Sequence, residues 1–291
     1  MIFKKMRFVR EKSVKSAERY KDVNIYLLTT EQDTFSRKRV RKKLSTPKQV
    51  KQDWKYAKQY ATQLVNANFT NGDYILTLTY DDEPLSREEA ERNVENFVAR
   101  LKTLYRRLGI PFRAFWVTGG GHPKKDGGVT RFHHHLIISG GADRDWVEAA
   151  WNYKDINRIP LSTSKKELDF LVSSRGEGNR VESSRAKIKK TEFGLEPIVK
   201  YMVKPAHCSP NPNAKRWHSC GLSKKPVETR SDTRYSEKEL HKLVKLIKDG
   251  QAQARIEAIY KGWELLEASP HTNEVTGLPY LWIKLRKKNT S

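Results

Sequence analysis

The chain has 291 residues, enough for one large or two modest domains, and it carries 57 Lys and Arg against 34 Asp and Glu. A formal charge of +23 favours a polyanionic partner, so we expect the chain to bind nucleic acid. The apolar runs are too short for a membrane span or a signal segment, and two cysteines are too few for a disulfide framework. We therefore expect a cytoplasmic protein without a membrane partner.

Residues 1–66 are predicted to form a basic arm followed by a helix. The first 65 residues hold 18 Lys and Arg against 6 Asp and Glu, and the densest run is residues 37–43 (RKRVRKK). Such a run is either a solvated tail or an arm that follows phosphates, and the concentration of charge favours the arm. Its expected DNA-binding residues are Arg37, Lys38, Arg39, Arg41, Lys42 and Lys43. Thr46, Pro47 and Gln49 then form a helix start, with apolar residues at helical spacing as far as Val65.

Residues 67–205 are predicted to form the core domain. Residues 74–80 (YILTLTY) alternate like a strand, and Ser86 with Glu89 opens a long helix that Gly109 ends. Residues 112–118 and 131–139 are two further strands, joined by a glycine-rich loop into a hairpin. Later elements are less regular: helices over 143–151, 164–172 and 192–204, an edge strand over 158–161, and an exposed connection over 173–190.

Residues 206–291 are predicted to be a basic extension that packs on the core. We expect an irregular segment over 208–234, helices over 236–249 and 255–266, and a strand over 278–285.

The strand over residues 131–139 (RFHHHLIIS) carries three consecutive histidines. Side chains on a strand alternate between faces, so His133 and His135 share a face, about 7 Å apart along the backbone, and His134 points away. A satisfied core histidine is the ordinary alternative for a single His. A His-x-His pair on an apolar strand favours a metal site, because neutral imidazole is the commonest metal ligand.

The helix over residues 192–204 carries Tyr201 and Lys204, three residues apart on one face. A phenol is a poor nucleophile at its free pKa of about 10, but a neighbouring ammonium and a metal-bound electrophile would activate it. Without other features, the structural reading is favoured, in which Tyr201 is an ordinary core aromatic and Lys204 caps the helix C-terminus.

The order of these features resembles the HUH endonucleases. Within them the chain is most similar to rolling-circle replication initiators of phages and plasmids, of the filamentous-phage gene-two type found in Firmicutes elements. The matching motifs are residues 75–80 (ILTLTY), 131–138 (RFHHHLII) and 200–205 (KYMVKP). Residues 64–69 (LVNANF) and 215–226 (KRWHSCGLSKKP) extend the likeness over most of the chain.

The resemblance implies an α+β fold, in which helices flank a five-stranded antiparallel sheet with basic helical additions at both ends. It also implies a metal-dependent DNA nickase and strand transferase. Tyr201 would attack a phosphate of a single-stranded or hairpin origin and become 5′-phosphotyrosine, while His133 and His135 hold Mg²⁺ or Mn²⁺ and Lys204 orients the phenol or the phosphate. A host helicase and DNA polymerase would be the partners in the bacterial cell. Arg131, Lys215 and Arg216 are further expected DNA contacts.

Two features depart from the family pattern. The third metal ligand is expected as a Glu near the end of the strand before the loop, but residues 117–122 read VTGGGH. His122, Asp82, Glu196 or a water could complete the site instead. The motif helix also offers one tyrosine, whereas some phage initiators carry an adjacent pair.

Three alternatives stay open. A relaxase or a transposase of the same superfamily would share the chemistry, and a basic nucleic-acid-binding protein with structural histidines would cleave nothing. Separately, His207, Cys208, His218 and Cys220 offer zinc-type ligands, although their spacing matches no standard zinc motif.

Overall fold

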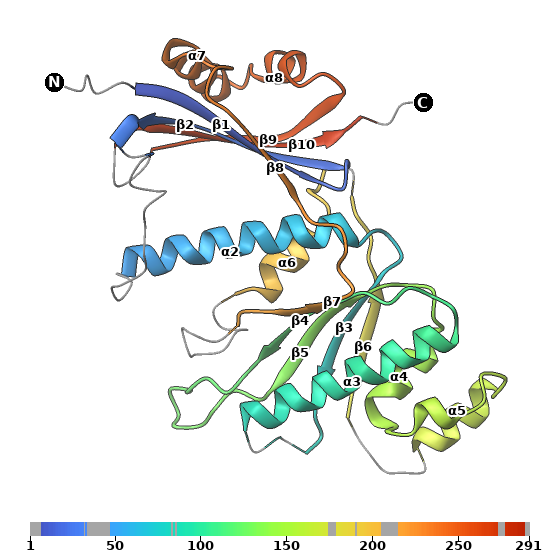
Figure 1. Cartoon of the computed structure of the whole chain (residues 1–291). Coiled ribbons are helices and arrows are strands. Elements are labelled where there is room, and N and C mark those ends of the chain that lie inside the picture. The colour runs from blue at the N-terminus through green and yellow to red at the C-terminus, as the bar shows by residue number, and fades with distance from the viewer. Residues whose placement is uncertain are drawn as a thin grey trace. The chain divides into compact units, whose positions relative to one another are not determined.

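The structure is a computed structural model that describes residues 7–31, 33, 47–82, 84, 86–173, 179–189, 191–204, 215–272 and 277–288. The chain forms two compact units. Residues 68–189 and 195–223 form the first, which we call the central unit. Residues 1–67, 190–194 and 224–291 form the second, which we call the terminal unit. Each unit is built on its own five-stranded antiparallel sheet (Figure 1).

The sheet of the central unit has the strand order β6-β3-β5-β4-β7. Its strands are β3 (Tyr74–Thr79), β4 (Ala114–Gly119), β5 (His133–Ile138), β6 (Val181–Arg185) and β7 (His218–Cys220). The histidine strand β5 lies at the centre, between β3 and β4, and all of these pairs are antiparallel. The predicted α+β class with a five-stranded antiparallel sheet flanked by helices is confirmed.

Helices cover the two faces of this sheet differently. They are α3 (Arg87–Arg107), α4 (Arg144–Asn152), the short 3₁₀ helix η1 (Ile156–Arg158), α5 (Lys165–Ser173) and α6 (Glu196–Met202). The apolar stripe of α3, including Phe97 and Leu101, packs with Leu136 and Ile138 of β5 in one buried core. In Figure 1, α3 and α4 lie on one side of the sheet and α6 on the other. The face of β5 that carries His133 and His135 is therefore the α6 face.

Helix α3 begins where the sequence predicts. The Ser86 side chain caps it by accepting a hydrogen bond from the Glu89 backbone N–H, and Glu88 and Glu89 lie in the first turn, where the helix dipole favours negative charge. The helix ends before Gly109, which adopts a positive φ of 69°.

The terminal unit joins the two ends of the chain in a second sheet, with the order β8-β1-β2-β10-β9. Its strands are β1 (Arg7–Ser16), β2 (Tyr20–Thr29), β8 (Val227–Ser231), β9 (Trp263–Thr272) and β10 (Pro279–Lys287). Its helices are α2 (Pro47–Asn68), α7 (Glu237–Lys248) and α8 (Gln253–Ile259), of which α2 and α7 match predicted helices. Leu240 and Leu243 of α7 and Ile256 of α8 share a core with the buried residues of β2 and β10.

This arrangement differs from the expected division into an arm, a core and a packed extension. Residues expected to lie in a basic arm form β1 and β2, in which Val9, Val23 and Ile25 are buried. In β2, Val23, Ile25 and Leu27 alternate with period two on one face, and the high charge of the segment obscured this pattern. The N-terminal and C-terminal segments thus complete one sheet, since β2 pairs with β10 and β1 with β8.

Four local predictions are also corrected. Residues 158–161 do not form the expected edge strand, and Arg158 is instead the last residue of η1. The connection over 173–190 contains the strand β6. The segment over 208–234 contains β7 and β8, and the helix expected over 255–266 ends at Ile259, before β9 begins. The missed strands β6, β7 and β8 pair with distant parts of the chain, and such pairing leaves little local signal, whereas β9 pairs with the following strand β10. The expected helix over 192–204 is shorter, as α6.

The basic run of residues 37–43 lies outside the described residues, as do His207 and Cys208. Within the described residues, no helix is both long enough and apolar enough to cross a membrane.

Candidate active site

The candidate site begins with the alternation of side chains along β5. His133 and His135 share a face, and their ring centroids lie 5.0 Å apart. In the sheet, Thr77 of β3 and Val117 of β4 are the register partners of His135, and Thr79 and Gly119 are those of His133. Since β5 has a strand on each side, both imidazoles are carried on a rigid backbone.

Hydrogen bonds orient each imidazole through its Nδ1 atom. His133 Nδ1 lies 3.1 Å from the Arg131 carbonyl oxygen, and His135 Nδ1 lies 3.3 Å from Thr77 Oγ1. A carbonyl oxygen only accepts, so His133 Nδ1 donates, and in the neutral ring Nε2 then carries the lone pair. Such support of one ring nitrogen is what orients histidines that bind metals through the other.

Gly119 makes room beside the first histidine. A Cβ built at this position would lie 2.5 Å from His133 Nε2, closer than real Cβ contacts. A side chain at residue 119 would therefore occupy the space next to this nitrogen. The donor set and this space fit a divalent cation held by two imidazoles.

His134 faces the opposite side and is fully buried. Its Nε2 lies 2.6 Å from Tyr80 Oη and its Nδ1 lies 3.0 Å from Thr118 Oγ1. Burial, and secondarily the neighbouring His133 and His135, lower the pKa of His134 to about 3. His134 is thus a neutral, hydrogen-bonded core residue that ties β5 to the ends of β3 and β4.

Helix α6 presents Tyr201 to the histidine pair. The Tyr201 ring is tilted 69° to the His135 ring, with 5.1 Å between the centroids. Val199 and Met202 anchor the buried side of the helix, whereas Tyr201 is 47% exposed. Lys204 Nζ lies 5.0 Å from the centre of the Tyr201 ring. The structure therefore brings together four residues named from the sequence, namely His133, His135, Tyr201 and Lys204.

The three candidates for a third ligand stay predictions. Glu196 forms an ion pair with Lys200, 2.7 Å between Oε1 and Nζ, and Asp82 is exposed beyond the end of β3. His122 Nε2 is buried without a hydrogen-bond partner among the described residues. Across the described ranges, no group of three or more His, Cys, Asp or Glu side chains has an arrangement that could hold a metal ion.

The expected DNA contacts are placed in part. Arg131 donates hydrogen bonds to the carbonyl oxygens of Tyr80 and Asp81, so it also fixes the end of β3 beside the start of β5. Lys215 is exposed, and Arg216 is half-buried next to it. Their contacts with DNA stay predictions.

Only half of the possible zinc cluster is described. His218 and Cys220 lie on β7, opposite Trp116 and Ala114 of β4, and Cys220 is a free cysteine. Zinc binding by this cluster stays untested.

Sequence reasoning assigned no role to Thr77 or Gly119, although both support the histidines. Thr77 lies in the first motif, two residues before Thr79, and this spacing places both threonines on one face of β3. That alternation was visible in the sequence. The pairing of Thr77 with His135 was not, because register across strands depends on the folded sheet.

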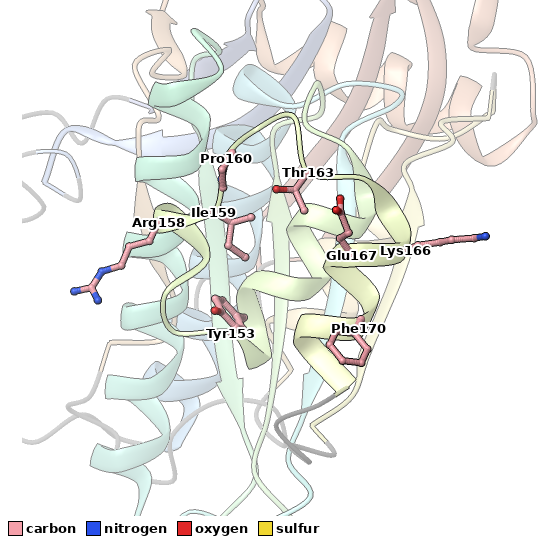
Figure 2. A pocket seen from close by; sticks show the side chains of 8 residues that line it. All are labelled: Tyr153, Arg158, Ile159, Pro160, Thr163, Lys166, Glu167 and Phe170. Carbon is pink, nitrogen blue, oxygen red and sulfur yellow. The ribbon is translucent and has the colours of Figure 1, made fainter.

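The central unit also holds a cavity of about 630 Å³ between η1 and α5 (Figure 2). Tyr153, Ile159 and Phe170 give it an apolar lining, and Figure 2 shows Arg158 and Lys166 pointing outward from it. Glu167, the carboxylate that lines it, already accepts hydrogen bonds from Ser164 at the start of α5. We therefore place no chemistry in this cavity.

An antiparallel sheet with a His-x-His pair on its central strand, beside an exposed tyrosine on a helix, is the arrangement expected of the HUH class. Residues 73–206 match the family model of the replication-associated protein of the ORF2 and gene-two-protein type. This segment runs from β3 to α6, and the match confirms the resemblance to replication-associated proteins of the gene-two type that was inferred from the sequence. No curated protein and no solved structure shows a significant match to the chain.

Proposed function

We propose that the chain is a metal-dependent, site-specific endonuclease and strand transferase that nicks single-stranded DNA at a replication origin. The observation that supports this most strongly is the position of the Tyr201 ring beside His135. A nucleophile and two metal-type ligands on neighbouring elements are the groups that phosphodiester transfer requires. The family match and the charge of +23 support DNA as the substrate.

In the proposed reaction, Tyr201 Oη attacks the scissile phosphorus atom and loses its proton to solvent. The bond from phosphorus to the 3′-oxygen breaks, and that oxygen takes up a proton. The products are a 5′-phosphotyrosyl bond on Tyr201 and a free 3′-hydroxyl, which a host polymerase can extend. Attack by a 3′-hydroxyl on the phosphotyrosyl bond reverses the step and rejoins a strand.

Each residue of the site has a separate task. Lys204, whose Nζ lies 5.0 Å from the centre of the Tyr201 ring, would orient the phenol or the phosphate. His133 and His135 would hold Mg²⁺ or Mn²⁺, with water or a phosphate oxygen completing the coordination. A bound cation would withdraw charge from the non-bridging oxygens of the phosphate.

The test combines single-stranded origin DNA, Mn²⁺ and a denaturing gel. We expect wild-type protein to give a nicked product and a covalent protein–DNA adduct, and Tyr201→Phe to give neither while it still binds the DNA. An adduct that persists in Tyr201→Phe would assign the nucleophile elsewhere. Absence of cleavage on every origin-like DNA would leave a binding protein.

The biological setting needs a second test. If the protein sustains replication of a plasmid that carries its own origin, it is an initiator. If it supports only transfer or transposition of that DNA, the relaxase or transposase alternative is correct.

A further inference from the structure

The central unit has a second cavity of about 560 Å³, at the edge of the sheet that β7 forms. On one side its wall is a stripe of α3 in which Glu95 and Lys102 are exposed. On the other side lie Trp116 of β4 and the chain from Lys215 to Cys220. The size is within the usual range for small-molecule sites, and it suits one nucleotide unit.

Three rings in the wall of this cavity, those of Trp116, Trp217 and His218, take part in aromatic stacking. The Trp116 and His218 rings are stacked, with 5.5 Å between their centroids and 20° between their planes. Trp217 is stacked on Phe115, with 6.0 Å between centroids and 29° between planes. Burial lowers the pKa of His218, which favours the neutral form of its ring. Stacked neutral aromatics are the surface on which unpaired bases stack in single-strand binding proteins.

The cavity also carries polar groups that can contact the phosphate and the base of a nucleotide. Lys102 and Lys215 are exposed at its rim, where they can contact phosphates. The Glu95 carboxylate lines the wall and can accept a hydrogen bond from the exocyclic amino group of cytosine. Thymine has no such amino group.

The position of the cavity connects it to the histidine face of the same sheet. Phe115 and Val117 lie on one face of β4, and Val117 is the partner of His135. Trp217 stacks on Phe115 and so lies at that face, whereas His218 stacks on Trp116 at the opposite face. Since β7 is the last strand of the sheet, a DNA strand can pass over this edge from one face to the other.

We propose that this cavity, lined by Glu95, Lys102, Trp116, Lys215, Trp217 and His218, binds an unpaired nucleobase of single-stranded DNA outside the nicking site. The site holds the strand by stacking and by contacts of the two lysines with phosphates, and Glu95 gives it a preference for a base with an amino group. This inference rests on the proposed function, because it takes single-stranded DNA as the substrate.

The experiment uses the full chain with Tyr201→Phe as the parent, so that binding is measured without cleavage. Fluorescence anisotropy with labelled oligodeoxycytidine and oligothymidine 12-mers, in chelator, gives the dissociation constants at several salt concentrations. We expect Trp217→Ala to weaken binding about 10-fold or more, as loss of a stacking aromatic does. The double variant K102E/K215E should also weaken binding and flatten the salt dependence.

Phe170→Ala is the matched control, because Phe170 is an aromatic residue that is 70% exposed and lines the other cavity. It should leave binding unchanged. The parent should bind oligodeoxycytidine more tightly than oligothymidine, and Glu95→Gln should narrow the difference. Equal binding of the two oligonucleotides by the parent would refute the role of Glu95.

The outcomes separate this inference from the proposed function. A parent that binds, with Trp217→Ala and K102E/K215E both within about 2-fold of it, overturns the base site and leaves the nicking function intact. A parent that binds no single-stranded DNA overturns both. Because Lys102 and Lys215 are exposed, K102E/K215E keeps the test valid even where Trp217→Ala fails to fold.

Discussion

The Tyr201 ring meets the His135 ring at 69°, with 5.1 Å between their centroids, although the two residues are 66 positions apart in the chain. Strand β5 supplies one ring and helix α6 the other. This contact places an exposed phenol next to a pair of imidazoles, and a polar, partly exposed site of this kind is suited to a reaction with a substrate from solvent. Four predictions concern the residues around it and the stability of the terminal unit.

Removal of the charge of Lys204 should slow adduct formation. Lys204 Nζ lies 5.0 Å from the centre of the Tyr201 ring, where its charge can stabilise the negative charge that develops in the transition state. We expect Lys204→Met to lower the single-turnover rate at pH 7 by roughly 100-fold, as removal of one electrostatic contact does in other active sites. Lys204→Arg keeps the charge and should retain most of the rate, and equal loss in both variants would exclude a role for the charge.

A side chain at residue 119 should interfere with metal binding. The Cβ of Gly119→Ala would lie 2.5 Å from His133 Nε2, so the imidazole has to move. We expect at least about 10-fold weaker binding of Mn²⁺ by calorimetry, since outer support of metal ligands is worth that much. Gly128→Ala is the matched control, because its Cβ would meet only Asp126 Oδ1 at 3.5 Å. Equal Mn²⁺ affinity in the two variants would contradict the prediction.

Loss of the Thr77 hydroxyl should act through His135. Thr77 Oγ1 lies 3.3 Å from His135 Nδ1, and Thr77→Val keeps the shape while it removes this contact. We expect about 10- to 100-fold weaker Mn²⁺ binding with little change in the thermal midpoint of unfolding. Thr77→Ser retains a hydroxyl and should recover affinity. A serine variant no better than the valine variant would show that the hydroxyl does not orient the imidazole.

Alkaline pH should destabilise the terminal unit through a buried tyrosine pair. Tyr235 Oη and Tyr260 Oη lie 2.9 Å apart, and Tyr260 Oη donates to Glu11 Oε2 at 3.1 Å. Burial is the largest cause that raises the pKa of Tyr235 to about 12. Unfolded Tyr235 loses its proton near pH 10 while the folded residue keeps it, so the unfolded state binds fewer protons. The stabilisation that Tyr235 contributes to the folded state is therefore complete below pH 10 and decreases as pH rises toward 12.

Urea unfolding of wild type and Tyr235→Phe at pH 9, 10 and 11 measures this effect. Between pH 10 and 11, wild type should lose about 1 kcal/mol more of its free energy of unfolding than the variant, because unfolded Tyr235 goes from half to almost fully deprotonated over this range while the folded residue keeps its proton. Parallel pH profiles for the two proteins would mean that Tyr235 titrates normally in the folded state.

Local patterns in the sequence were sufficient for much of the central unit. The alternation in residues 74–80 and 131–139, the cap at Ser86 and the stop at Gly109 each depend on neighbours within a few residues. They placed β3, α3 and β5 and put His133 and His135 on one face. The Tyr-x-x-Lys spacing likewise indicated that Lys204 lies near Tyr201, although α6 ends at Met202 and Lys204 follows it.

Contacts between distant parts of the chain settled the rest. No short-range pattern indicates that β1 and β2 pair with β8 and β10, or that Thr77 lies opposite His135 and Trp217 against Phe115. The strands β6, β7 and β8 are short and polar, so their hydrogen bonds form only where another strand already offers its edge. Short-range periodicity records which face a side chain occupies, whereas the neighbour across that face depends on how the sheets assemble.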